Sequence, residues 1–191
     1  MKTILISIFC VLFSSNFFGQ DQREKKAIAS TKILKEQLKR SVSDSARFRL
    51  TTELSTEYNN ASKFDSCKKY AQIAINFSKK FNSKKQNSSN QKKFKKFQAK
   101  ALQNFGVSLS YDNVAPALVI LNESLQIWKE IGDKNGIAMT YYSLAIAYGN
   151  KSNSVEALNY FNKSLELFKE TKNEFYIANT LYNISLEKRY L

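Results

Sequence analysis

The chain has 191 residues, of which 43% are hydrophobic and 13% aromatic, enough apolar side chains for one domain with a buried core. Five glycines and one proline are few, and because these residues break helices and build turns, their scarcity favours an all-α fold. Histidine is absent, as are Gly-rich phosphate loops and paired Cys motifs, so we expect neither an enzyme nor a cofactor or metal.

Residues 1–19 have the pattern of a secretory signal peptide. Lys2 gives the positive start, and the apolar stretch from Ile4 to Phe13 is too short to span a bilayer as a helix. We expect cleavage near the Gly19–Gln20 bond and a periplasmic location, with an uncleaved anchor as the alternative. The leader and the Lys-, Asn- and Phe-rich usage resemble exported proteins of Gram-negative bacteria.

Residues 20–43 follow as an amphipathic helix, either packed on the next segment or mobile. Ser43 and Asp44 then mark a helix start, because their side chains can accept hydrogen bonds from exposed backbone amides. Apolar spacing predicts helices over residues 45–60 and 64–81, with Cys67 in a small core slot. Residues 82–91 have no apolar residue and predict a linker, after which a basic amphipathic helix begins near residue 92.

A helical hairpin over residues 136–170 recurs along the chain. Its first helix carries apolar residues at i, i+3, i+4 and i+7, a polar turn follows at Asn150 to Ser154, and a second helix has the same spacing. The pattern returns about 40 residues earlier, where Trp128 lies in the last turn of the second helix and Gly132 can end that helix. A looser copy precedes residue 81. The matching positions are Tyr141, Leu144, Ala145, Tyr148, Ala157, Phe161, Ser164 and Leu165, against Leu102, Phe105, Gly106, Leu109, Ala117, Leu121, Ser124 and Leu125.

This pattern resembles the tetratricopeptide repeat (TPR), a helix–turn–helix unit of about 34 residues, in a longer variant of about 40. Serine stands at Ser124 and Ser164 where the family has small alanine, and the family's proline after the second helix is missing. The resemblance implies an α-solenoid of stacked antiparallel hairpins. Its segments are repeat 1 (44–81), a linker with a basic helix start (82–98), repeat 2 (99–135), repeat 3 (136–173) and a partial repeat or capping helix (174–191).

The resemblance also implies a binding surface on the first helix of each repeat. We expect a non-catalytic exported scaffold that binds a protein or peptide there. The alternative is a truncated or stand-alone input domain of a signalling regulator without its membrane helix and effector module. The family's carboxylate-clamp pattern is not reproduced. The family's ligand-facing slots fall on Arg49, Thr52, Thr56, Asn60, Lys100, Gln103, Val107, Tyr111, Met139, Tyr142, Ile146 and Asn150.

The formal net charge of +14 is concentrated in one half of the chain. Residues 20–100 carry a net charge of +14 and residues 101–191 a net charge of −1. A basic patch of Lys92, Lys93, Lys95 and Lys96 suggests a solvated face, an anionic membrane surface or an acidic protein. Because lysine dominates and arginine is scarce, we do not expect nucleic acid as a partner.

Overall fold

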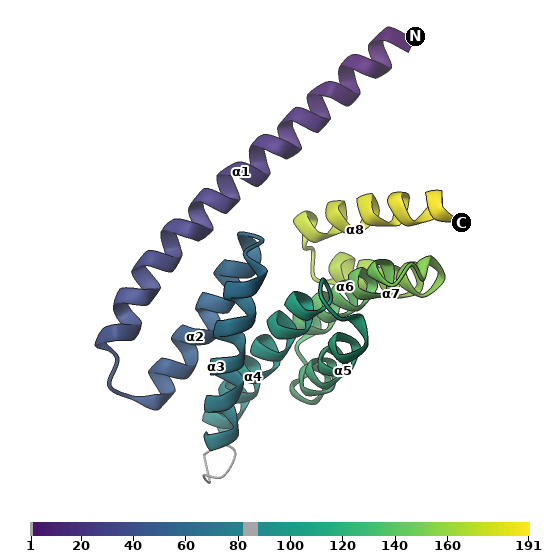
Figure 1. The fold of residues 1–191 in the computed structure, drawn as a ribbon. Helices are drawn as coiled ribbons and strands as arrows, with labels where there is room; N and C mark the ends of the chain where they lie inside the picture. The colour runs from purple at the N-terminus through teal and green to yellow at the C-terminus, as the bar shows by residue number, and fades with distance from the viewer. Residues whose placement is uncertain (1, 82–87) are drawn as a thin grey trace.

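The computed structural model describes the backbone of residues 2–81 and 88–191 and the side chains of residues 21–79 and 90–191. Within these ranges the chain is all α-helical (Figure 1). No helix in the described part combines the length and apolarity needed to cross a bilayer. The helices are α1 (Lys2–Arg40), α2 (Asp44–Asn60), α3 (Phe64–Phe81), α4 (Ser88–Leu109), α5 (Val114–Ile131), α6 (Lys134–Asn150), α7 (Ser154–Glu170) and α8 (Glu174–Glu187), followed by a 3₁₀ turn, Lys188–Tyr190.

The helices form an α-solenoid in which α2/α3, α4/α5 and α6/α7 are antiparallel hairpins (Figure 1). The first helices lie side by side, since α2 contacts α4 and α4 contacts α6, and stacking of this kind creates a concave inner face. The long helix α1 packs against α2 as α3 packs against α4. Its Arg23 guanidinium also lies 3.8 Å from the centre of the Phe175 ring on α8.

Two buried serines each join the two helices of one hairpin, which explains why serine stands where the repeat family has alanine. Ser124 Oγ donates to the carbonyl oxygen of Ala99 at 2.7 Å, and Ser164 Oγ donates to that of Ala138 at 2.9 Å. Both serines are fully buried. The serine hydroxyl is small enough for the two helices to approach closely, and it donates its hydrogen bond to a carbonyl oxygen of the facing helix. Serine is therefore tolerated at this position.

The turns between helices follow the expected chemistry. Ser43 and Asn153 accept hydrogen bonds from backbone amides in the first turn of α2 and α7. Gly132 ends α5 with a φ of 69°, as its position predicts. Ser62, Ser152 and Lys172 adopt the same left-handed conformation at other helix ends, where a side chain is disfavoured.

The segment between repeats 1 and 2 differs in part from the prediction. α4 begins at Ser88, so residues 88–91, expected in the linker, are helical. Residues 82–87 lie outside the described residues, as do Met1 and the side chains of residues 2–20, on which the signal-peptide prediction depends. The helix therefore starts before the apolar periodicity that marked it in the sequence.

Candidate functional site

A pocket of about 270 Å³ opens on the inner face between α2, α4, the end of α5 and the start of α6. It collects side chains from all three hairpins, although they are distant in sequence. Phe97 and Met139 contribute apolar wall. Five residues predicted for the groove line this pocket, namely Thr52, Thr56, Lys100, Gln103 and Met139.

The wall formed by α5 and α6 depends on a tryptophan packed against a glycine. Trp128 is 3% exposed, and its indole lies directly against Gly136. A Cβ placed on Gly136 would come 2.2 Å from Trp128 Cδ2, far inside van der Waals contact. Glycine at this position is therefore what lets the indole reach the pocket.

Lys100 is, with Lys96, one of the two cations that line the pocket. Its side chain is partly exposed, and burial lowers the pKa of its ammonium group below the ordinary value. It forms no ion pair or hydrogen bond with any side chain described in residues 21–79 and 90–191. The two carboxylates that line the pocket form ion pairs with other residues. Asp133 pairs with Lys96 at 3.1 Å, and Glu53 pairs with Arg49 at 2.8 Å.

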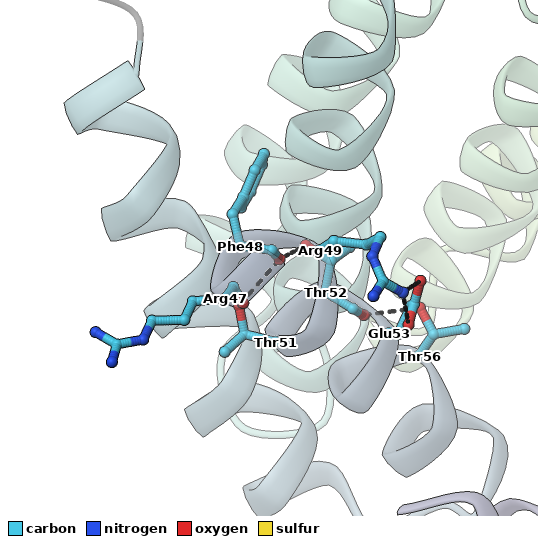
Figure 2. Close-up of polar contacts among 7 residues, drawn as sticks. All are labelled: Arg47, Phe48, Arg49, Thr51, Thr52, Glu53 and Thr56. Atoms are coloured by element: carbon cyan, nitrogen blue, oxygen red, sulfur yellow. Dashed lines mark hydrogen bonds and ion pairs between the residues drawn. The ribbon is translucent and has the colours of Figure 1, made fainter. Parts of the chain in front are cut away.

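Figure 2 shows the α2 side of this arrangement. Arg49 donates to both carboxylate oxygens of Glu53, at 2.8 and 2.9 Å, and lies with Thr56 on the side of the helix opposite Arg47. The hydroxyl of Thr52 donates to the Phe48 carbonyl oxygen at 2.8 Å. Arg49 Nη1 and the Thr52 hydroxyl thus bond within α2, and both cations that line the pocket, Lys96 and Lys100, lie on α4.

Two of the three buried side-chain polar atoms that lack a hydrogen-bond partner in the described part of the chain belong to this pocket. They are Gln103 Oε1, a carbonyl acceptor, and Trp128 Nε1, an indole donor. The Gln103 amide nitrogen is used, because it donates to Ser143 Oγ at 3.2 Å. Buried polar atoms without partners are rare, and both atoms lie on side chains that are almost fully buried.

Several predicted groove residues join the first helices to one another. Asn104 Nδ2 donates to Ser55 Oγ and Thr56 Oγ1 at 2.8 and 2.9 Å, and Asn183 Nδ2 donates to Tyr142 Oη at 2.9 Å. Together with the bond from Gln103 to Ser143, these contacts link α2, α4, α6 and α8 in sequence. We call this set of bonds the polar ladder. Thr56 and Tyr142 are therefore partly committed to structure.

The remaining predicted groove residues lie outside the pocket. Val107 and Ile146 are half-buried against core clusters. Asn150 Nδ2 donates to the carbonyl oxygen of Ser110 at 3.1 Å, which joins α6 to the end of α4. Asn60 and Tyr111 are exposed, and Tyr111 stacks on Phe64 with ring centres 4.0 Å apart. The structure thus brings five of the twelve positions into one site and separates the rest.

The basic patch is partly neutralised by residues far along the chain. Lys95 pairs with Glu130 at 3.0 Å and Lys96 with Asp133, while Lys92 and Lys93 are exposed. Lys134 pairs with Glu170 at 2.9 Å in the next hairpin, the same positions as Lys95 and Glu130 one repeat later. Lys95 and Lys96 therefore contribute ion pairs within the repeat structure.

Cys67 and the carboxylates offer no nucleophile or metal site in the described chain. Cys67 is fully buried, and burial raises the pKa of its thiol to about 12, so it stays protonated. Among the described residues, no three Cys, Asp or Glu side chains gather closely enough to hold a metal ion.

The chain is similar to known helical-repeat proteins. Residues 112–186 match the family model described as tetratricopeptide repeat, and no curated protein matches the chain by sequence. A Rap protein complexed with Competence and Sporulation Factor superposes with a TM-score of 0.73 and 14% identity, over 87% of this chain and 45% of that one. The apo form of RapI gives 0.61 and 18%, over 88% and 44%.

A third solved structure, BtubC from P. vanneervenii, gives a TM-score of 0.51 with 15% identity, over 88% of this chain and 65% of that one. The chain spans less than half the length of the two Rap structures and about two thirds of BtubC. At these identities the likeness concerns the fold. The family match over residues 112–186 and the superpositions support a TPR-like helical-repeat fold.

Proposed function

We propose that the chain is a non-catalytic scaffold that binds a segment of another protein or peptide in the pocket on its inner face. The observation that carries this proposal is the pocket itself, in which Phe97 and Met139 form apolar wall beside Lys100, a cation without an ion pair among the described residues. Concave pockets with apolar walls and a few convergent polar groups are typical ligand sites.

The comparison with solved structures supports the same function. The Rap protein that superposes on 87% of this chain was solved in complex with Competence and Sporulation Factor, so this fold can hold a separate factor. Helical repeats bind partners through their concave surfaces because the stacked first helices present one extended face.

The test compares partner capture by the full chain with capture by two matched variants. Met139→Arg places a long side chain in the pocket at a half-buried position, whereas Val119→Arg makes the same kind of change at a position that is 67% exposed on α5. In photo-crosslinking from envelope extract, we expect a partner retained by Val119→Arg and lost from Met139→Arg. Equal capture by both variants refutes binding in the pocket.

A second candidate, the input domain of a signalling regulator, is favoured by the coverage of the comparisons. The chain aligns with 45% and 44% of the two Rap chains, as expected for one part of a longer regulator. An adjacent or continuous reading frame that encodes a membrane helix and an effector module supports this candidate. A partner that binds in the pocket without any such module in the gene neighbourhood contradicts it.

Export to the periplasm is part of the proposal and rests on the pattern of residues 1–19. Cell fractionation and N-terminal sequencing test it, with a mature protein that begins near Gln20 as the expected result. A cytoplasmic chain that retains Met1 refutes export.

Binding to an anionic membrane through Lys92 and Lys93 is tested by sedimentation with anionic vesicles at low salt, where an unbound chain disproves it.

A further inference from the structure

The outer face of α8 is exposed along the length of the helix. On its other side α8 packs on α7 (Figure 1), and Thr180 and Ile184 are buried there. Leu181 and Tyr182 are 49% and 57% exposed, although both are large apolar side chains that lie next to each other. The exposed residues recur at helical spacing and form one row, which we call the α8 stripe. The α8 stripe consists of Glu174, Ala178, Leu181, Tyr182, Ser185 and Arg189.

The α8 stripe occupies the face that a second helix covers in the preceding hairpin. The helices α6 and α8 are in the same register, because their capping residues, Asp133 and Asn173, lie 40 positions apart. By the same offset Ala178 corresponds to Ala138, which is fully buried under α7 and accepts a hydrogen bond from Ser164. Within the described chain, the face that α7 covers on α6 is therefore open on α8.

The same stripe also has the residue spacing of a second helix. In α5 and α7, a buried alanine is followed four positions later by a large apolar residue and seven positions later by a serine. The matching residues are Ala117, Leu121 and Ser124 in α5, Ala157, Phe161 and Ser164 in α7, and Ala178, Tyr182 and Ser185 in α8. The six residues of α5 and α7 are all buried against a first helix. Thus α8 presents both sides of a hairpin interface on one face.

A helix face with both patterns can pack against a copy of itself. When two copies of α8 lie antiparallel about a two-fold axis at the middle of the stripe, Ala178 of each copy faces Ser185 of the other. This pairing repeats the contact in the hairpin α6/α7, where Ser164 Oγ donates to the carbonyl oxygen of Ala138 at 2.9 Å. Ser185 Oγ donates to the Tyr182 carbonyl oxygen within α8 at 2.7 Å and would exchange it for Ala178 of the second copy.

The charges at the ends of the stripe fit the same antiparallel arrangement. Glu174 of each copy would meet Arg189 of the other, and neither residue forms an ion pair within the described part of the chain. At the centre, Leu181 of each copy would lie against Tyr182 of the other, which removes both apolar side chains from water. A parallel pair would instead place Glu174 against its own copy, where like charges repel.

We propose that α8 is a self-association surface through which two copies of this chain form an antiparallel, two-fold symmetric helix pair. Each α8 would serve as the second helix for the other copy, so that the open face is covered on both copies at once. The described residues that line the pocket include none of the α8 stripe, so this association is separate from the binding proposed there.

Sedimentation velocity of the full chain measures this association at protein concentrations of about 1–200 µM, a range suited to a small interface. We expect a reversible equilibrium between monomer and dimer. Ala178→Arg places a long charged side chain where the two helices approach most closely, and we expect it to stay monomeric. Val119→Arg makes the same kind of change at an exposed position on α5 and should associate like the parent.

Two outcomes of this comparison overturn the proposal. A parent chain that is monomeric throughout the range leaves the α8 stripe to a helix of another protein. Equal association of the Ala178→Arg and Val119→Arg variants shows that the copies meet through another surface.

A charge exchange tests the antiparallel register with substitutions at two exposed positions. Glu174→Arg and Arg189→Glu each set like charges against each other twice in the dimer, and we expect either change to weaken association at low salt by about tenfold. The double variant restores both pairs with their signs reversed and should associate like the parent. A double variant as weak as the single ones refutes the helix pair, provided all three variants melt at the parent temperature.

Discussion

Gly136→Ala is the substitution whose effect follows most directly from the structure. Its new Cβ would lie 2.2 Å from Trp128 Cδ2, 2.3 Å from Cε3 and 2.7 Å from Cε2. Carbon atoms in contact are normally about 3.5–4.0 Å apart, so the indole has to move by more than about 1 Å. Trp128 is 3% exposed, and its rigid ring has little room for this displacement.

Two opposing effects decide the magnitude. Alanine in place of glycine in a helix stabilises by roughly 0.5–1 kcal/mol, and overpacking of a core costs typically about 1–3 kcal/mol. Because three ring atoms clash at once, we place the steric cost near the upper end and expect a net loss of about 2 kcal/mol. For a chain of this length, that lowers the melting temperature by about 4–8 °C.

Thermal melting followed by circular dichroism measures this loss, with Gly149→Ala as the matched control on the same helix. A Cβ on Gly149 would meet Glu187 Oε1 at 2.6 Å, which is the end of a flexible side chain that can turn away. We expect Gly149→Ala to melt at the parent temperature or slightly above it. Equal melting of the two variants, with unchanged Trp128 emission in Gly136→Ala, refutes the packing argument.

Three further predictions test the core, a turn and a buried thiol. Leu144→Glu places a carboxylate at a fully buried position and should lower the free energy of unfolding by about 4 kcal/mol or more. We expect the helical signal of repeat 3 to be lost. Unchanged thermal melting followed by circular dichroism would show that the repeat register is wrong. Ser152→Gly removes a side chain from a residue with φ 58° and should raise the free energy of unfolding by up to about 1 kcal/mol, measured by urea titration, whereas a loss would contradict the strain. Burial raises the pKa of the Cys67 thiol from 9.0 to about 12. The contribution of the thiol to stability is therefore complete below pH 9 and is lost as the pH rises toward 12. In a Cys10→Ser background, a disulfide reagent should modify Cys67 at pH 8 only after denaturation.

The positions of the helices follow from the sequence wherever apolar residues recur at helical spacing. The spacing predicts a helix over residues 64–81, and α3 spans Phe64–Phe81. The start of α4 was not predictable in this way, because residues 88–91 are polar and carry no apolar stripe. Helix continues there because polar residues prolong a turn that the apolar residues further along have already stabilised.

The lining of the pocket was predictable only in part. Lys100, Gln103 and Met139, three of the family's ligand-facing slots, line the pocket because all three lie on first helices. The family's slots did not indicate Trp128, which belongs to the second helix α5 and reaches the inner face across Gly136. A tryptophan followed eight residues later by a glycine, across a helix end, is the signal that could have revealed it.

Charge counting along the chain was limited for a similar reason. The run of lysines near residue 92 suggests a basic patch when only neighbouring residues are considered. The carboxylates that pair with Lys95 and Lys96 lie 35 and 37 residues further along the chain and become neighbours only after the hairpin closes. Such partners can be found only when the repeat register is already known.

The polar ladder has a consequence for how a ligand would meet this protein. Three amide side chains fix the first helices to their neighbours along the inner face, and a slip of one helical turn between any two helices would break a bond there. A purely apolar contact can slide more easily, because its attraction has little direction. The curvature of the inner face is therefore set before any ligand arrives, and association loses less conformational entropy than it would on helices free to shift.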